Sequence, residues 1–164
     1  MQPAPDRLLG IYLADHLAAA TAGVALAHRT ARSNVGTPFG DVLRRLAGEI
    51  EEDRETLRKV VEQLGFQESK AKDAAAWVAE KLGRLKLNGQ LRGYSPLSRV
   101  LELEALSVGV AGKLALWQSL QSLPGLGERL AGFDLEELAE RAGRQRTEIE
   151  EQRLEAARTA FGSR

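Results

Sequence analysis

Apolar side chains recur every three or four residues along 43–64, and this repeat constrains the fold more than any other feature of the chain. Asp53 is the one charged residue on a stripe made of Leu43, Leu46, Ile50, Asp53, Leu57, Val60 and Leu64. The spacing is typical of the core-facing side of a helix in a bundle. No segment alternates apolar and polar residues for long, and the strong helix formers Leu, Ala, Glu and Arg dominate. The sequence therefore predicts an all-α protein.

Capping and breaking signals divide the chain into five helices, four of them long. Thr37-Pro38 and Ser95-Pro96 each resemble an N-cap followed by a proline at the first helical position. Asp134, with a glutamate three residues later, predicts a capping-box-like start. Gly65 followed by Phe66 predicts a Schellman ending. We expect helices over about 6–32, 38–64, 69–87, 96–123 and 134–161.

The lengths of the connections predict how these helices pair. The short connection 33–37 makes the first two helices antiparallel neighbours, whereas 65–95 is long enough to travel the length of the bundle. The connection 124–133 is of intermediate length. We therefore expect a single domain over 1–164: a four-helix bundle of two antiparallel hairpins joined by a long crossover that contains a short fifth helix.

The composition excludes several classes of function. The absence of cysteine excludes disulfides, thiolate metal sites and a cysteine nucleophile. Lys plus Arg and Asp plus Glu are 23 each, and neither half of the chain is basic, so nucleic-acid binding is not expected. No apolar run approaches the ~18 residues of a membrane span, and the first ten residues lack a signal-peptide pattern. We expect a cytoplasmic protein with no membrane insertion.

Polar residues interrupt the predicted apolar stripes near the middle of the helices. Asp53 lies between Ile50 and Leu57, and His16 lies on the corresponding stripe of the first helix. An unpaired polar group in a core costs ~1–3 kcal/mol, so these groups should meet partners. We predict a core polar pair between His16 and Asp53. Either this pair only fixes the helix register, or it belongs to a functional site.

The helix lengths, hairpin pairing and crossover resemble the ferritin-like superfamily, which includes small bacterial proteins of unassigned role. The chemistry of that family rests on glutamates from two helices and Glu-x-x-His on the other two. Here His16 is preceded at that spacing by Leu13, and His28 by Ala25, so the motif is absent. The resemblance therefore implies the fold without a di-iron centre, and we expect no cofactor.

A carboxylate-rich metal site is one alternative. His16, Asp53, Glu49 and Glu104, with Asp15 nearby, could supply oxygen ligands and one nitrogen. The other interpretation is that the carboxylates of 49–55 form a solvated face.

Small residues cluster on two of the long helices. Ala19, Gly23 and Ala27 are four apart, and 107–112 reads Ser-Val-Gly-Val-Ala-Gly. Glycine costs ~1 kcal/mol relative to alanine inside a helix, so another interaction should offset it. The small residues either allow close helix–helix approach or shape a cavity for an apolar ligand. Aromatic candidates for the lining of such a cavity are Tyr12, Trp77 and Trp117.

The stretch 81–99 is locally basic, with five Lys or Arg residues and no acid. An anion could bind at the start of the helix at 96, held by Arg84, Lys86, Arg92, Ser95 and Arg99. Alternatively, the arginines tie the crossover to acidic faces.

Three functions remain open. The first expectation is a non-catalytic ferritin-like bundle that acts as an interaction or structural module, as a homodimer or with another protein partner. The second is a degenerate, carboxylate-rich metal-binding protein. The third is a carrier of a small apolar ligand in the bundle core. No Gly-x-Ser-x-Gly, P-loop or Gly-x-Gly-x-x-Gly motif is present, and no catalytic residue is predicted.

Overall fold

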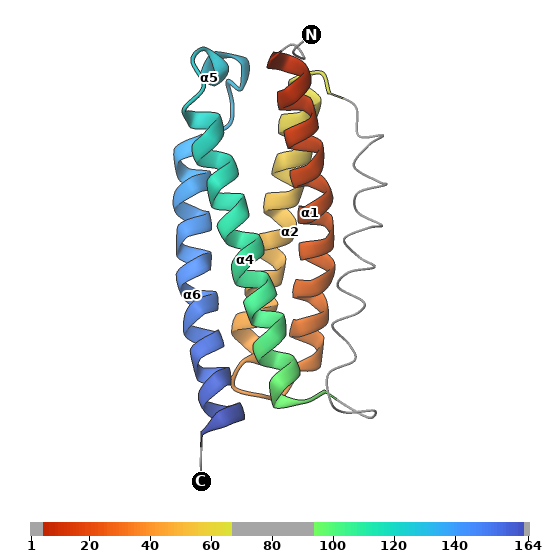
Figure 1. Ribbon diagram of the computed structural model, residues 1–164, viewed down its shortest axis with the longest axis vertical. Coiled ribbons are helices and arrows are strands. Elements are labelled where there is room, and N and C mark those ends of the chain that lie inside the picture. The colour runs from red at the N-terminus through yellow and green to blue at the C-terminus, as the bar shows by residue number, and fades with distance from the viewer. Residues whose placement is uncertain (1–4, 67–93, 163–164) are drawn as a thin grey trace.

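The computed structural model describes residues 5–66 and 94–162, and this part of the chain is helical with no strand (Figure 1). The prediction of an all-α protein is confirmed. The predicted helix 69–87 lies outside the described residues. The described helices are α1 (Pro5–Ser33), α2 (Gly40–Gln63), α4 (Pro96–Gln121), the single-turn α5 (Leu126–Arg129) and α6 (Leu135–Phe161).

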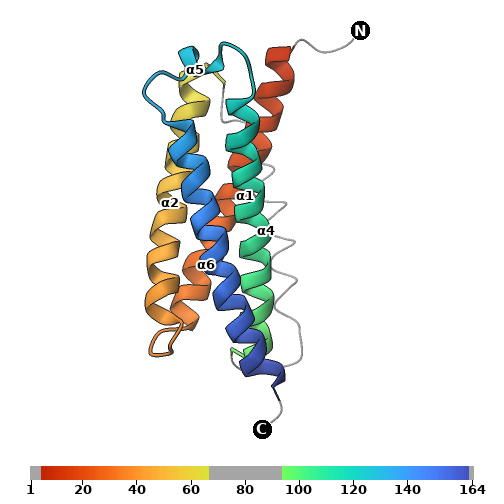
Figure 2. The ribbon, with the colours of Figure 1, turned by 90° about the vertical axis from the view of Figure 1, so that its left-hand side faces the viewer.

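The long helices form two antiparallel pairs, α1 with α2 and α4 with α6 (Figures 1 and 2). Helix α2 ends at the end of the bundle where α1 begins, whereas α4 begins at the opposite end. Helices α2 and α4 therefore run in the same direction. Helix α4 also packs against α1, and this contact joins the two pairs.

Two of the three predicted N-terminal capping signals are confirmed. The Ser95 hydroxyl accepts from the Ser98 amide at 3.0 Å, and the Asp134 carboxylate accepts from the Glu137 amide at 3.0 Å. The predicted start of α2 at Thr37-Pro38 is wrong, because α2 begins at Gly40. The Thr37 hydroxyl instead donates to the Asn34 carbonyl at 2.7 Å and stabilises the turn.

The predicted Schellman ending of α2 is confirmed. Gly65 has φ +78°, its amide donates to the Glu62 carbonyl, and the Phe66 amide donates to the Val61 carbonyl. The Phe66 ring then lies directly on Gly10 of α1, where an added Cβ would approach Phe66 Cδ1 to 2.9 Å. This contact fixes one end of the α1–α2 hairpin.

The core consists of two apolar clusters, one in each half of the bundle. The seven predicted stripe residues of α2 are all buried, Asp53 included. The stripe of α1 is less well predicted, because His16, Ala20 and Val24 are only half-buried while Leu17 and Leu26 are buried. The two clusters include Leu13, Leu57, Val60, Trp117, Leu120 and Leu135 in one half, and Leu26, Leu43, Leu46, Val100, Leu103 and Ile149 in the other.

The prediction that no apolar run is long enough for a membrane span needs one correction, in α1. By length and composition alone, Asp6–Ser33 is apolar and long enough to do so. In the bundle, Leu13, Leu17 and Leu26 of this helix are buried in the core. The bundle buries 28% of the most apolar 18-residue window of this helix.

Candidate functional site

A buried layer of polar side chains separates the two apolar clusters. Asp53 of α2, 3% exposed, forms ion pairs with Lys113 of α4 and Arg141 of α6. The Lys113 ammonium also donates to the Gln145 side-chain carbonyl. Burial lowers the pKa of Lys113, and the negative charge of Asp53 partly opposes this shift. The layer thus contains two cations around one buried carboxylate, drawn from three helices.

The polar layer continues to the surface between α2 and α6. The Gln145 amide donates to Glu49 Oε2 at 3.1 Å, and Arg45 donates to Glu49 Oε1 at 2.7 Å. Arg45 also pairs with Glu148 on α6. Glu49, proposed above as a metal ligand, therefore links the buried layer to surface ion pairs.

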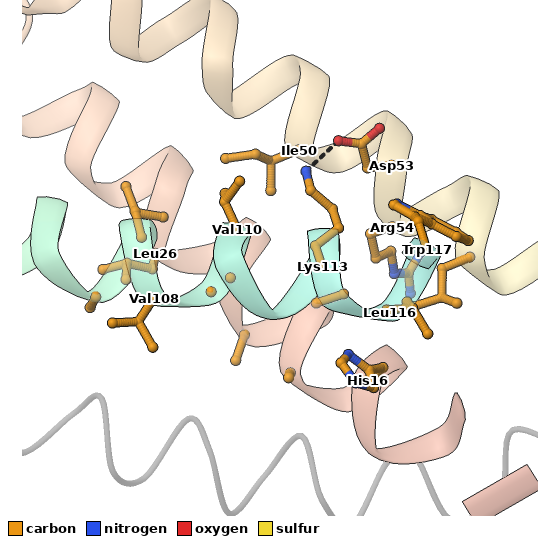
Figure 3. A pocket seen from close by; sticks show the side chains of 18 residues that line it. His16, Leu26, Ile50, Asp53, Arg54, Val108, Val110, Lys113, Leu116 and Trp117 are labelled. Carbon is orange, nitrogen blue, oxygen red and sulfur yellow. Dashed lines mark hydrogen bonds and ion pairs between the residues drawn. The ribbon is translucent and has the colours of Figure 1, made fainter. Parts of the chain in front are cut away.

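A cavity of about 220 Å³ lies between α1, α2 and α4 beside this layer, and α1 lines it mainly with alanine and glycine (Figure 3). The lining is mostly apolar. It consists of His16, Ala19, Ala20, Ala22, Gly23 and Leu26 of α1; Ile50, Asp53, Arg54 and Leu57 of α2; and Ala105, Leu106, Val108, Gly109, Val110, Lys113, Leu116 and Trp117 of α4.

The glycines of the cavity wall decide between the two interpretations of the small residues. A Cβ built on Gly23 or Gly109 would meet no atom of the described chain within 4 Å. Close helix packing therefore does not require glycine at either position, in contrast to Gly10 beneath Phe66. The geometry favours the cavity over close helix approach for this pair of glycines.

Trp117 is a wall of the cavity and carries an unsatisfied donor. Its side chain is fully buried, and its indole Nε1 has no hydrogen-bond partner among the described residues. A buried indole usually finds an acceptor for its N–H group. Of the other predicted aromatic lining residues, Tyr12 donates to Ser119 Oγ at 3.4 Å and is not part of the wall, and Trp77 lies outside the described residues.

The predicted pair of His16 with Asp53 is not formed. Both side chains line the cavity, but Asp53 binds Lys113 and Arg141 instead. The His16 ring packs edge-on against Tyr12, with 4.5 Å between the ring centroids. His16 lies at the edge of the α1 stripe, which leaves it half-buried. Burial lowers its pKa, and the negative charge of Asp15 partly opposes this shift.

The structure does not bring the four proposed metal ligands together. Asp53 is already bound by two cations, an environment that opposes a further cation, and Glu49 is held by Arg45 and Gln145. Glu104 is half-exposed and lies 3.8 Å from Arg153. Among the described residues, no three His, Asp or Glu side chains gather as a metal site.

The described part of the proposed anion site has a structural role. Ser95 is buried and caps α4, while Arg99 Nε donates to Asn34 Oδ1 at 2.5 Å and its guanidinium lies 4.5 Å from the centre of the Phe39 ring. The other proposed members, Arg84, Lys86 and Arg92, lie outside the described residues.

Buried hydrogen bonds around Asn34 join the start of α4 to the end of α1. The Asn34 amide donates to the Tyr94 hydroxyl at 3.0 Å, and this hydroxyl donates to Glu102 at 3.0 Å. Glu102 also pairs with Arg29 of α1 at 2.8 Å. The Glu102 carboxylate is therefore neutralised by Arg29 of α1.

Lys113 and Arg141, the two partners of Asp53, were not predicted from the sequence. Lys113 lies three residues after Val110 and four before Trp117, so it fits the core-facing stripe of α4. The adjacent Leu114 fits the same stripe and is apolar, and it was therefore assigned to the core instead. Lys113 could have been predicted as the partner because it is the only charged residue of α4 on the C-terminal side of Glu104. A carboxylate on the α2 stripe requires such a cation from a facing helix.

Comparison with known proteins adds no assignment: no family model, no curated protein and no solved structure matches this chain. The fold and the site thus define an all-α helical bundle with a mostly apolar cavity next to a buried polar layer.

Proposed function

We propose that the protein binds a small, mainly apolar molecule in the cavity between α1, α2 and α4. The observation that carries this proposal is the mostly apolar cavity of about 220 Å³, whose wall includes Gly23 and Gly109. Alanine at both positions would stabilise the helices by ~1 kcal/mol each. Glycine keeps these two wall positions free of a side chain, at this cost in helix stability. Ligand sites are typically apolar hollows of this kind with a few polar groups.

The cavity volume limits the size of the ligand. A cavity of about 150 Å³ holds benzene. In proportion, about 220 Å³ accommodates roughly nine non-hydrogen atoms. A medium-length alkyl chain or a single substituted aromatic ring fits this limit, and a long-chain lipid does not.

The test is titration of the full chain with octan-1-ol, followed by amide chemical shifts in ¹H–¹⁵N NMR. We expect saturable shifts at Ala19, Gly23 and Gly109, which line the cavity. Gly109→Leu places a side chain in the cavity and should abolish these shifts. The matched control is Gly143→Leu on α6, which also has space for a Cβ and does not line the cavity. Unsaturable shifts, or equal binding by both variants, would overturn the proposal.

We also retain the ferritin-like assignment as a proposal. It is supported by the two antiparallel hairpins and by the parallel direction of α2 and α4. The missing Glu-x-x-His motif argues for a bundle that binds ligands or partners without di-iron chemistry.

A second candidate function is the non-catalytic interaction module, as a cytoplasmic homodimer. Exposed apolar side chains support it, chiefly Val108 in the middle of α4 at 73% exposure and Ile11 of α1 at 40%. Sedimentation velocity over a wide concentration range tests it. A monomer at the highest concentrations would contradict the homodimer.

A further inference from the structure

The solvent-facing sides of α1 and α4 are apolar, whereas those of α2 and α6 are densely charged. Asp15 is the only Asp, Glu, Lys or Arg between residues 8 and 27 of α1. After Glu104, Lys113 is the only one in α4, and it binds Asp53 in the core. A helix that is apolar on all sides is normally covered on all sides. The pattern therefore predicts that a further element covers α1 and α4.

Exposed apolar residues of these two helices form a surface that we call the α1–α4 outer face. Val108 of α4 is 73% exposed, and Leu8 of α1 is 52% exposed. On α4, exposed and half-buried residues of this face recur every three or four positions: Leu97, Leu101, Ala105, Val108, Gly112 and Ala115. On α1, Leu8, Ile11 and Ala19 are exposed, and the bundle buries only 28% of the most apolar 18-residue window. An apolar surface of this kind is typical of an interaction site.

The connection between α2 and α4 begins and ends beside α1. Phe66, just before it, lies on Gly10, where an added Cβ would approach Phe66 Cδ1 to 2.9 Å. Tyr94, just after it, accepts a hydrogen bond from Asn34 at 3.0 Å, directly beyond the end of α1. Helix α2 ends at one end of the bundle and α4 begins at the other (Figure 1), so these contacts are about 36 Å apart along α1. The shortest path between them runs along α1.

The connection itself, residues 67–93, lies outside the described residues, but its sequence fits the outer face in length and in pattern. We expect a helix over 69–87, about 28 Å long, and the eight residues that flank it can span the remaining distance. The apolar residues of this helix recur every three or four positions and define one side: Ala71, Ala74, Val78, Leu82 and Leu85. A helix with one apolar side requires an apolar surface to cover it.

Charge also favours this segment as the occupant of the face. Residues 67–93 contain six basic and three acidic residues, so their net charge is +3 and that of the remaining chain is −3. Asp15, between Ile11 and Ala19 on the outer face, is an exposed carboxylate. The basic flanks of the segment can therefore pair with acidic groups beside the apolar contact.

We infer that residues 69–87 form an amphipathic helix that packs on the α1–α4 outer face, with Val78 at the level of Val108. Val78 is the midpoint of this helix, and Val108 lies about 18 Å along α4 from its start, half of the distance to be spanned. The inference assigns the face to the chain itself rather than to a second copy. It goes beyond the proposed ligand and does not depend on it.

Cysteine pairs test this contact directly, because the chain contains no cysteine of its own. Under mild oxidation, Val108→Cys should form an intrachain disulfide with Val78→Cys, since packed helices bring facing Cβ atoms close enough. Ala74→Cys and Leu82→Cys, each with Val108→Cys, cover a shift of one helical turn. The matched control is Glu80→Cys, on the polar side of the expected helix, and we expect it to cross-link at least about tenfold more slowly. Intact mass without reductant measures the yield.

Tryptic cleavage gives a second readout that needs no cross-link. Val108→Asp places a charge beneath the segment, and we expect cleavage after Lys72, Lys81 and Arg84 to become at least about tenfold faster. The control is Leu154→Asp on α6, which replaces another exposed apolar residue by the same charge.

The outcomes decide between the occupants of the face. Disulfides between two chains, with a yield that rises with protein concentration, would assign the face to a second copy and overturn the inference. Equal cross-linking by Val78→Cys and Glu80→Cys, or equal cleavage of Val108→Asp and Leu154→Asp, would also overturn it. None of these readouts uses octan-1-ol, so a failure here leaves the ligand proposal to its own test.

Discussion

Lys113 of α4 forms a buried ion pair with Asp53 of α2 at the level where the apolar core divides in two. On α2 the apolar residues before and after Asp53 belong to different clusters, and the same is true of α4 around Lys113. A shift of α4 by one turn along α2 would separate the Lys113 ammonium from the Asp53 carboxylate. The pair therefore favours one register among the several that similar apolar stripes would allow.

This coupling predicts a non-additive response to mutation. Lys113→Met leaves Asp53 with Arg141 alone, and we expect it to lower the free energy of unfolding by about 1–3 kcal/mol. Asp53→Leu leaves the cation Lys113 buried without its carboxylate and should cost about 3–5 kcal/mol. The double variant should recover much of this loss, because the buried ammonium that Asp53→Leu leaves unpaired is gone and Arg141 keeps its ion pair with Glu52. Urea denaturation measures all three, and additive losses would argue against coupling between the two residues.

The accuracy of prediction from sequence differed between helices for a physical reason. The stripe of α2 was predictable because its large apolar residues alternate with charged ones, so only one face can be buried. Helix α1 is rich in alanine on several faces, so its stripe could be rotated with little loss of apolar content, and His16 was placed too far inward. The capping residues Ser95 and Asp134 were predictable because capping is local.

The candidate site was harder to predict than the helices, because it depends on how helices face one another. Asp53 was correctly placed in the core, but its partners come from α4 and α6, and helix register is not a local property. The small residues Gly23 and Gly109 were recognised, yet the sequence left open whether they meet a neighbouring helix or empty space. Only the positions of the surrounding atoms decide that question.

Alanine substitutions at Gly109 and Gly10 should change the free energy of unfolding in opposite directions. Gly109→Ala should raise the free energy of unfolding by about 1 kcal/mol, because alanine favours the helix and its Cβ meets no described atom. Gly10→Ala should lower it by about 1–2 kcal/mol, because the new Cβ would overlap the Phe66 ring and the strain outweighs the helix propensity. Thermal and urea unfolding of the two variants check the signs. A stabilising Gly10→Ala would mean that Phe66 moves away at little cost.

Removal of the Tyr94 hydroxyl should destabilise the end of the bundle where α4 begins. It accepts from Asn34 and donates to Glu102, so Tyr94→Phe removes two hydrogen bonds at partly buried groups. We expect a decrease of about 1–2 kcal/mol in the free energy of unfolding. Tyr12→Phe is the matched control, because its hydroxyl makes one long, exposed contact with Ser119. Equal effects of the two variants would show that the hydroxyl of Tyr94 contributes little.

The final prediction concerns His16 and pH. Burial lowers the pKa of His16 below its ordinary value of 6.5, an effect larger than the opposing one of Asp15. Between the folded pKa and 6.5, the unfolded chain therefore binds more protons than the folded chain. Stability is then fully present above pH 6.5 and falls as the pH drops through this window.

Replacing His16 with glutamine should remove this contribution to the pH dependence. We expect the difference in urea midpoint between about pH 7.5 and about pH 5 to be smaller in His16→Gln than in the original chain. His28→Gln is the control, since His28 contacts Glu51 at the surface and does not line the cavity. If His16→Gln keeps the whole difference, the neutral ring of His16 does not contribute to stability, and the loss at low pH arises from other groups.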